Sequence, residues 1–125
     1  GYAKLTGWKQ VAQLENKSGK FVSPGPESGA AALAAAEFPG GTLPGSDVPN
    51  LIAWVWDPAG ETSYPIATFT WMLFYKDQDD AKAEALRKLV EYGVTEGQKI
   101  ADEMGYIPLP ENVAEKVKSA AKFIQ

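Results

Sequence analysis

The chain has 125 residues, and its 12 basic and 16 acidic side chains give a formal net charge of −4 at pH 7. These numbers fit one small soluble domain and exclude nucleic-acid binding through a broad basic surface. The sequence contains no cysteine and no histidine. Disulfide bonds, thiolate or imidazole metal ligands, cysteine nucleophiles and histidine bases are therefore excluded together.

The first third of the chain predicts a hairpin followed by a helix. Residues 10–14 alternate loosely between polar and apolar, and 20–22 form a short apolar burst. The turn cluster with Asn and Gly between them favours two short strands or a hairpin. The spacing then predicts a helix over 26–37, because Pro26 suits the first helical position and an alanine-rich run follows it. Pro39-Gly40-Gly41 ends this helix.

Two strands are expected in the middle of the chain, after a loop over 40–50. The apolar run 51–56 has the length of a strand. Residues 64–75 carry the strongest strand signal, with bulky side chains at both parities. That pattern is typical of a central strand that is covered on both sides.

Three helices are expected after residue 76. An apolar stripe predicts a helix over 81–93. Residues 95–98 match a capping box, which predicts a helix from Thr95 to Met104 with Gly105 just beyond its end. A last helix is expected over 110–124.

The acidic cluster before the first of these helices is interpreted as a helix start. Counting from Asp77, the positions at which a calcium-binding EF-hand needs Gly and Glu hold Lys82 and Lys88. We therefore expect Asp77, Asp79 and Asp80 to cap the helix and to favour its dipole.

No residue set indicates catalysis, a metal site or a cofactor, and the chain is not expected to be an enzyme. No serine or threonine has a histidine partner, and no spacing pairs Glu37, Asp57 or Glu61 for acid/base work. Of the tryptophans, Trp71 is expected in the core. Trp54 and Trp56 would share a strand face, either as an exposed patch or as a partner surface.

Four blocks resemble one known family. They are residues 16–24 (NKSGKFVSP), 64–78 (YPIATFTWMLFYKDQ), 95–98 (TEGQ) and 105–110 (GYIPLP). In this order and spacing they resemble the bacterial phosphate-binding proteins, the substrate-binding subunits of the phosphate ABC transporter. The opening Gly-Tyr dipeptide is also similar to that family, so the resemblance covers essentially the whole chain.

The resemblance implies an α/β fold: the C-terminal part of a two-lobed periplasmic-binding-protein (type II) fold, with a mixed sheet flanked by helices. Residues 1–63 would end the second lobe, and 64–125 would supply the C-terminal strand and three helices of the first, so that both lobes are incomplete. The family's phosphate ligands lie on early loops and on an Arg-x-x-x-Ser-Gly-Thr loop, which this sequence lacks. No ligand-binding residue can therefore be assigned, and the segment should expose much apolar strand edge.

The implied function is capture of inorganic phosphate for an ABC transporter permease by closure of two lobes about a hinge. Tyr64, Pro65 and Ile66 are the hinge candidates, and a simple strand start is the alternative. Phosphate would bind only with the preceding N-terminal part, and a complementary N-terminal fragment or a second copy of the chain would be a further partner. The first residues do not read as a signal peptide, so we expect either a cytoplasmic protein or a mature chain whose start has been removed. The location that the resemblance implies is periplasmic or extracellular, with membrane association through a preceding N-terminus as an option. The alternative function is a stand-alone interaction or structural protein that lacks ligand binding.

Overall fold

Helices and one small hairpin make up the regular structure, which is compatible with an α/β class. The computed structural model describes residues 2–125, so Gly1 of the opening Gly-Tyr dipeptide lies outside the described residues. The elements in chain order are α1 (Tyr2–Leu5), β1 (Leu14–Glu15), β2 (Phe21–Val22), α2 (Pro26–Ala34), α3 (Asp80–Val94), α4 (Gln98–Ala101) and α5 (Glu111–Ala121). Helix α1 was not predicted, because a single turn is too short to show a helical period.

The predicted hairpin is confirmed in a shorter form. Strands β1 and β2 pair antiparallel, with Leu14 opposite Val22 and Glu15 opposite Phe21. Gly19 closes the turn at a φ of 71°, a left-handed conformation that glycine adopts without steric cost.

Helix α2 begins at Pro26, as predicted, and ends three residues earlier than expected. The N–H of Ala36 donates to the carbonyl of Leu33 at 3.2 Å, which tightens the last turn instead of extending the helix. The proline at 39 disfavours helical backbone in the residue before it. The chain therefore leaves the helix before the predicted end.

The prediction of two strands at 51–56 and 64–75 is wrong for the described chain. Both segments are extended, but their only bridge among residues 2–125 is a single antiparallel pair, Trp56 with Ile66. A strand needs a hydrogen-bonded neighbour along its length. The described residues supply no second segment that continues the ladder along 68–75, so the apolar pattern remains without a sheet.

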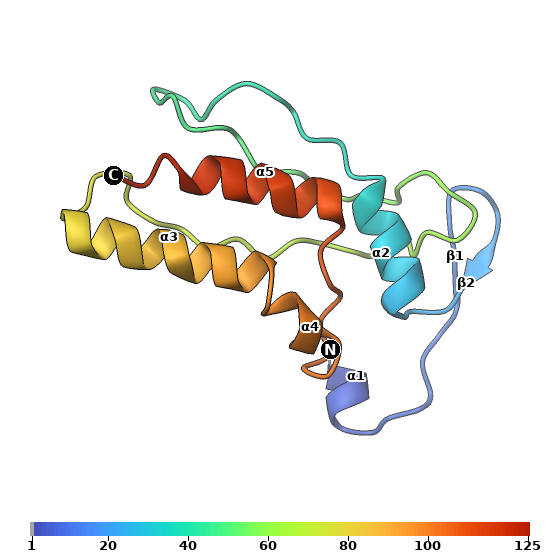
Figure 1. Ribbon diagram of the computed structural model, residues 1–125. Coiled ribbons are helices and arrows are strands. Elements are labelled where there is room, and N and C mark those ends of the chain that lie inside the picture. Colours follow the sequence, from blue (N-terminus) through green and yellow to red (C-terminus); the bar gives the residue numbers. More distant parts are fainter. Residues whose placement is uncertain (1) are drawn as a thin grey trace.

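Helices α3 and α5 lie side by side and form the first of two hydrophobic clusters (Figure 1). Ala83 and Val90 of α3 are buried together with Ile124, next to half-buried apolar neighbours. The C-terminal residue is joined to the segment before α3, because the N–H of Gln125 donates to the carbonyl of Lys76 at 2.7 Å. The predicted helices over 81–93 and 110–124 are thus confirmed, with ends that differ by one to three residues.

The prediction of a capping box at 95–98 is wrong. The hydroxyl of Thr95 donates backwards to the carbonyl of Glu91 at 2.7 Å, and the amide of Gln98 donates to the carbonyl of Gly93. Both side chains therefore satisfy carbonyls at the end of α3 instead of opening the next helix, and α4 is a single turn whose N-cap is Gly97. Gly105 has a φ of 81° and follows this turn as the predicted terminal glycine.

The second and larger cluster joins α2 to α5 through the extended segments. Its buried members are Ala32, Leu33, Ala53, Val55, Phe69 and Val113. Trp71 packs against it half-buried and donates its indole N–H to the carbonyl of Leu51 at 3.0 Å. The expected core position of Trp71 is therefore confirmed.

Candidate functional site

One buried side chain organises the region around the hinge candidates. Asn16 is 5% exposed and stands at the start of the hairpin turn. Its Oδ1 accepts hydrogen bonds from the N–H groups of Ser18 at 3.0 Å and Lys20 at 3.1 Å. Its Nδ2 donates to the carbonyls of Gly60 at 3.1 Å and of Glu61 and Ser63 at 3.0 Å. The carboxamide thus joins two segments that are more than forty residues apart in the sequence.

The loop that receives these hydrogen bonds is itself tightly held. The N–H of Lys17 donates to Oδ1 of Asp57 at 2.9 Å, and Asp57 has a φ of 38°. Ser63 is 2% exposed and donates its hydroxyl to the carbonyl of Ala59 at 2.9 Å. Gly60 is required at its position, because it has a φ of 122° and an added Cβ would lie 2.7 Å from the Ser63 hydroxyl.

The structure places the hinge candidates directly after this loop. The N–H of Tyr64 donates to the carbonyl of Ser28 in α2 at 3.1 Å, and the carbonyl of Pro65 accepts from the N–H of Asp57 at 3.2 Å. Ile66 stands opposite Trp56, and its side chain is exposed. Their role as a hinge stays a prediction, as does the lobe boundary between residues 63 and 64.

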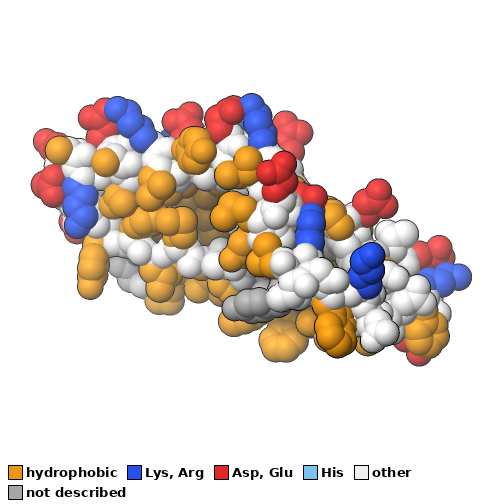
Figure 2. Space-filling view, turned by 90° about the horizontal axis from the view of Figure 1, so that it is seen from below, with side chains coloured by type: hydrophobic (Ala, Val, Ile, Leu, Met, Phe, Trp, Pro, Cys, Tyr) orange, Lys and Arg blue, Asp and Glu red, His pale blue; other side chains and the backbone are white. Residues whose placement is uncertain are grey.

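An unpartnered apolar segment follows the hinge candidates. From residue 68 to 75 no backbone N–H of the described chain donates a hydrogen bond. Phe69 is buried, but Met72, Leu73 and Tyr75 are exposed, Leu73 to 92%. The expected exposure of apolar strand edge is thus confirmed, and hydrophobic side chains gather over a hollowed face of the molecule (Figure 2).

The expected strand face shared by Trp54 and Trp56 does not form, because residues 51–56 are not a strand, but the two rings still lie close together. The ring centroids of Trp54 and Trp56 lie 6.0 Å apart, and those of Trp54 and Trp71 lie 5.7 Å apart in an edge-on arrangement. Trp54 and Trp56 are mostly exposed. Aromatic groups of this kind suit a partner surface.

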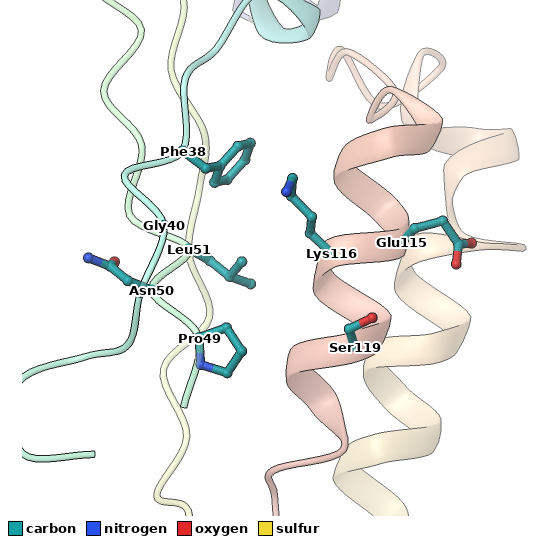
Figure 3. A pocket seen from close by; sticks show the side chains of 9 residues that line it. Phe38, Gly40, Pro49, Asn50, Leu51, Glu115, Lys116 and Ser119 are labelled. Atoms are coloured by element: carbon teal, nitrogen blue, oxygen red, sulfur yellow. The ribbon is translucent and has the colours of Figure 1, made fainter. Parts of the chain in front are cut away.

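Sequence reasoning missed a pocket of about 310 Å³ between the 38–51 loop and α5. Figure 3 shows Lys116 reaching from α5 towards Phe38, while Pro49 and Leu51 face the helix and Asn50 points away. The Lys116 ammonium lies 5.4 Å from the centroid of the Phe38 ring, a cation–π distance. Local sequence patterns carry no signal for this pocket, because it forms between segments more than sixty residues apart.

No described part of the chain gathers the groups needed for metal binding. Residues 2–125 contain no cluster of three or more acidic or other metal-ligating side chains. In the acidic cluster, Asp79 accepts a hydrogen bond from the N–H of Lys82 at 3.0 Å, so the expected helix cap is confirmed. Of the helices in the described region, none combines the length and the apolar composition needed to span a bilayer.

An ion pair ties the long loop to the end of the extended segment. Nζ of Lys76 donates to Oδ1 of Asp47 at 2.8 Å. This hydrogen bond lowers the pKa of Asp47 and raises the pKa of Lys76 from their ordinary values. Both groups are solvent-accessible, so the pair acts as a weak surface tether.

The comparisons with known proteins point to one class, the phosphate-binding proteins. The chain is 35% identical over 123 residues to the phosphate-binding protein PstS of Methanocaldococcus jannaschii, covering 92% of this chain and 31% of that protein. It is 30% identical over 112 residues to PstS of Pasteurella multocida, covering 89% of this chain and 30% of that protein. For PstS of Haemophilus influenzae the identity is 29% over 110 residues, with coverage of 87% and 31%.

These similarities define what kind of segment the chain is. Over about nine tenths of its length it is similar to part of a PstS phosphate-binding protein. No family model matches the chain. The chain spans about a third of the length of the curated relatives that it matches, so the activity of those whole proteins does not pass directly to it.

Proposed function

We propose that this chain is the C-terminal scaffold of a phosphate-binding protein that captures inorganic phosphate outside the inner membrane and delivers it to an ABC transporter permease. The observation that carries the proposal is the similarity to PstS proteins over 92% of the chain at 35% identity. The relatives are named as binding proteins, and the chain is accordingly assigned a binding role and no enzymatic role.

The described residues support a scaffold without the phosphate ligands. A buried oxyanion needs several N–H or guanidinium donors that converge on one point. The single arginine, Arg87, donates to the carbonyl of Ile124 at 2.5 Å. Gly40 and Gly41 lie just before the bridge between Thr42 and Pro49, and no helix follows them directly. The donors that hold phosphate would therefore come from polypeptide outside this sequence.

The unpaired segment 68–75 supports the same proposal. Its free N–H groups and alternating bulky side chains are those of a strand without a neighbour. Polypeptide preceding this sequence would supply the adjoining strands and cover Met72, Leu73 and Tyr75, completing the periplasmic-binding-protein (type II) fold. Residues 1–63 and 64–125 would then belong to two lobes, with Tyr64, Pro65 and Ile66 at the crossing.

A chimera tests the proposal directly. Residues 1–125 replace the aligned segment of the M. jannaschii phosphate-binding protein, and isothermal titration measures binding of inorganic phosphate. The chimera is expected to bind phosphate, whereas the 125-residue chain alone is expected to bind none. A folded chimera without phosphate binding would overturn the family assignment. Tight binding by the chain alone would overturn the scaffold role.

A stand-alone interaction protein is the second candidate, and the exposed tryptophan pair favours it. Trp56 is 79% exposed beside Trp54, an arrangement that suits docking of a partner. The intact mass of the protein in its source cells separates the two candidates. A mass near three times 13.5 kDa supports the transporter subunit, and a mass of 13.5 kDa supports the stand-alone protein.

A further inference from the structure

We propose that Asn16 is a clamp that makes the hairpin, α2 and the 57–65 loop one rigid unit, so that bending of the chain begins after Pro65. The inference rests on the proposed function at one point only, where the bending of the chain is described as a movement of two lobes. The clamp itself follows from the hydrogen bonds around one side chain. It narrows the hinge candidates to Ile66, which stands at the edge of this unit in a single bridge with Trp56.

The chemistry of the carboxamide explains why asparagine is needed. The Oδ1 atom accepts two backbone N–H groups from the turn, and the Nδ2 atom donates to three carbonyls from the loop. An acceptor and a donor are thus required on the same short side chain. Asn16 and Ser63 are both buried, so loss of the donor would leave the carbonyl of Ser63 unpaired and away from water.

Further hydrogen bonds join the two ends of the 57–65 loop to the hairpin turn and to α2. The carboxylate of Asp57 accepts from the turn, and the carbonyl of Ser28 in α2 accepts from the N–H of Tyr64. The carbonyl of Pro65 is bonded to the N–H of Asp57. Beyond this point the N–H groups of residues 68–75 have no acceptor within the described chain. The carbonyl of Pro65 is thus the last hydrogen-bonded backbone group of the clamped unit, and the boundary of that unit falls between Pro65 and Thr68.

Hydrogen exchange of the unaltered chain gives the first test. The amides of Ser63 and Tyr64 are expected to exchange at least about tenfold more slowly than those of residues 68–75. Equal exchange in the two groups would overturn the proposal, and this result does not depend on any variant folding. Phosphate binding is not measured here, so failure of the clamp and failure of the proposed function are separate outcomes.

Asn16→Asp provides the second test, because it keeps the shape and replaces the donor by an acceptor. An ionised carboxylate would face the carbonyls of Gly60, Glu61 and Ser63, which raises the pKa of the new carboxyl. The variant should therefore have a lower Tm than the original chain at about pH 7, and the difference should shrink towards about pH 4. A pH-independent difference, or none, would overturn the clamp.

Gln13→Ala is the matched control for the second test. Gln13 is another carboxamide near the hairpin, but it is exposed and donates one hydrogen bond, to the hydroxyl of Ser23. This variant should leave the exchange of Ser63 and Tyr64 unchanged. If it accelerates their exchange as much as Asn16→Asp does, protection comes from the hairpin as a whole and the assignment to Asn16 is overturned.

Discussion

Gly29 of α2 lies so close to Ile107 that a Cβ added to the glycine would be 2.0 Å from Cδ1 of the isoleucine. Gly29 is buried, and Ile107 packs against the larger hydrophobic cluster. Glycine in the middle of a helix normally costs stability. Here the absence of a side chain lets α2 approach the segment that leads into α5.

We expect Gly29→Ala to destabilise the protein by about 1–3 kcal/mol, because the added methyl group overpacks the contact with Ile107. Urea unfolding followed by far-ultraviolet circular dichroism measures the change. A helical glycine with free space serves as the control. An added Cβ at Gly93 would meet no heavy atom within 4 Å, so Gly93→Ala should stabilise the protein by about 0.5–1 kcal/mol. Equal effects of the two substitutions would contradict the close contact.

Phe69 and Leu73 share a parity in the extended segment but should differ in their contribution to stability. Phe69 is 8% exposed in the larger cluster, whereas Leu73 is 92% exposed. Phe69→Ala should cost about 3–5 kcal/mol, and Leu73→Ala should change the free energy of unfolding by less than about 0.5 kcal/mol. Denaturant titrations of both variants check this. A large loss for Leu73→Ala in the isolated chain would show that this side chain is covered.

Asp79→Ala should cost about 0.5–2 kcal/mol, because it removes the side chain that accepts the hydrogen bond from the N–H of Lys82 at the start of α3. Asp77→Ala is the matched control, since Asp77 belongs to the same acidic cluster and does not cap the helix. Thermal unfolding of both variants measures the difference. Similar losses would indicate that the charge of the cluster matters and the cap does not.

The ion pair of Asp47 with Lys76 should make the position of the long loop depend on pH. The pKa of Asp47 is lowered chiefly by its hydrogen bond from Lys76. Its contribution to the stability of the fold is therefore present above the pKa of the unfolded chain, and it is lost as the pH falls through the pKa of the folded chain. The pKa of Lys76 is raised chiefly by the same hydrogen bond. Its contribution to stability is therefore lost as the pH rises through the pKa of Lys76 in the folded chain.

Asp47→Asn tests this tether. The variant should be slightly less stable than the original chain at neutral pH, and the difference should vanish in acid, where Asp47 is protonated. Thermal unfolding at several pH values checks the trend, and added salt should reduce it, because the pair is exposed. A difference that grows in acid would contradict the assigned pair.

Local sequence signals were enough to predict the elements whose stabilising contacts lie within a few residues of one another. Pro26 starts α2, Asp79 caps α3, and the turn with Gly19 makes the hairpin. The same local logic failed at 95–98, because Thr95 and Gln98 can bond either forwards into a new helix or backwards into the old one. The choice depends on the packing around α4, which includes the N–H of Leu109 donating to Oε1 of Gln98.

The sequence alone determined the family resemblance, the helices α3 and α5, and the absence of catalytic histidine or cysteine. Only the tertiary structure decided that Asn16 bonds the loop before Tyr64, that Gly29 meets Ile107, and that residues 68–75 have no strand beside them. The physical reason is the distance along the chain between interacting groups. A cap or a turn is satisfied by neighbours in the sequence, whereas a sheet ladder or a buried carboxamide needs partners from distant segments.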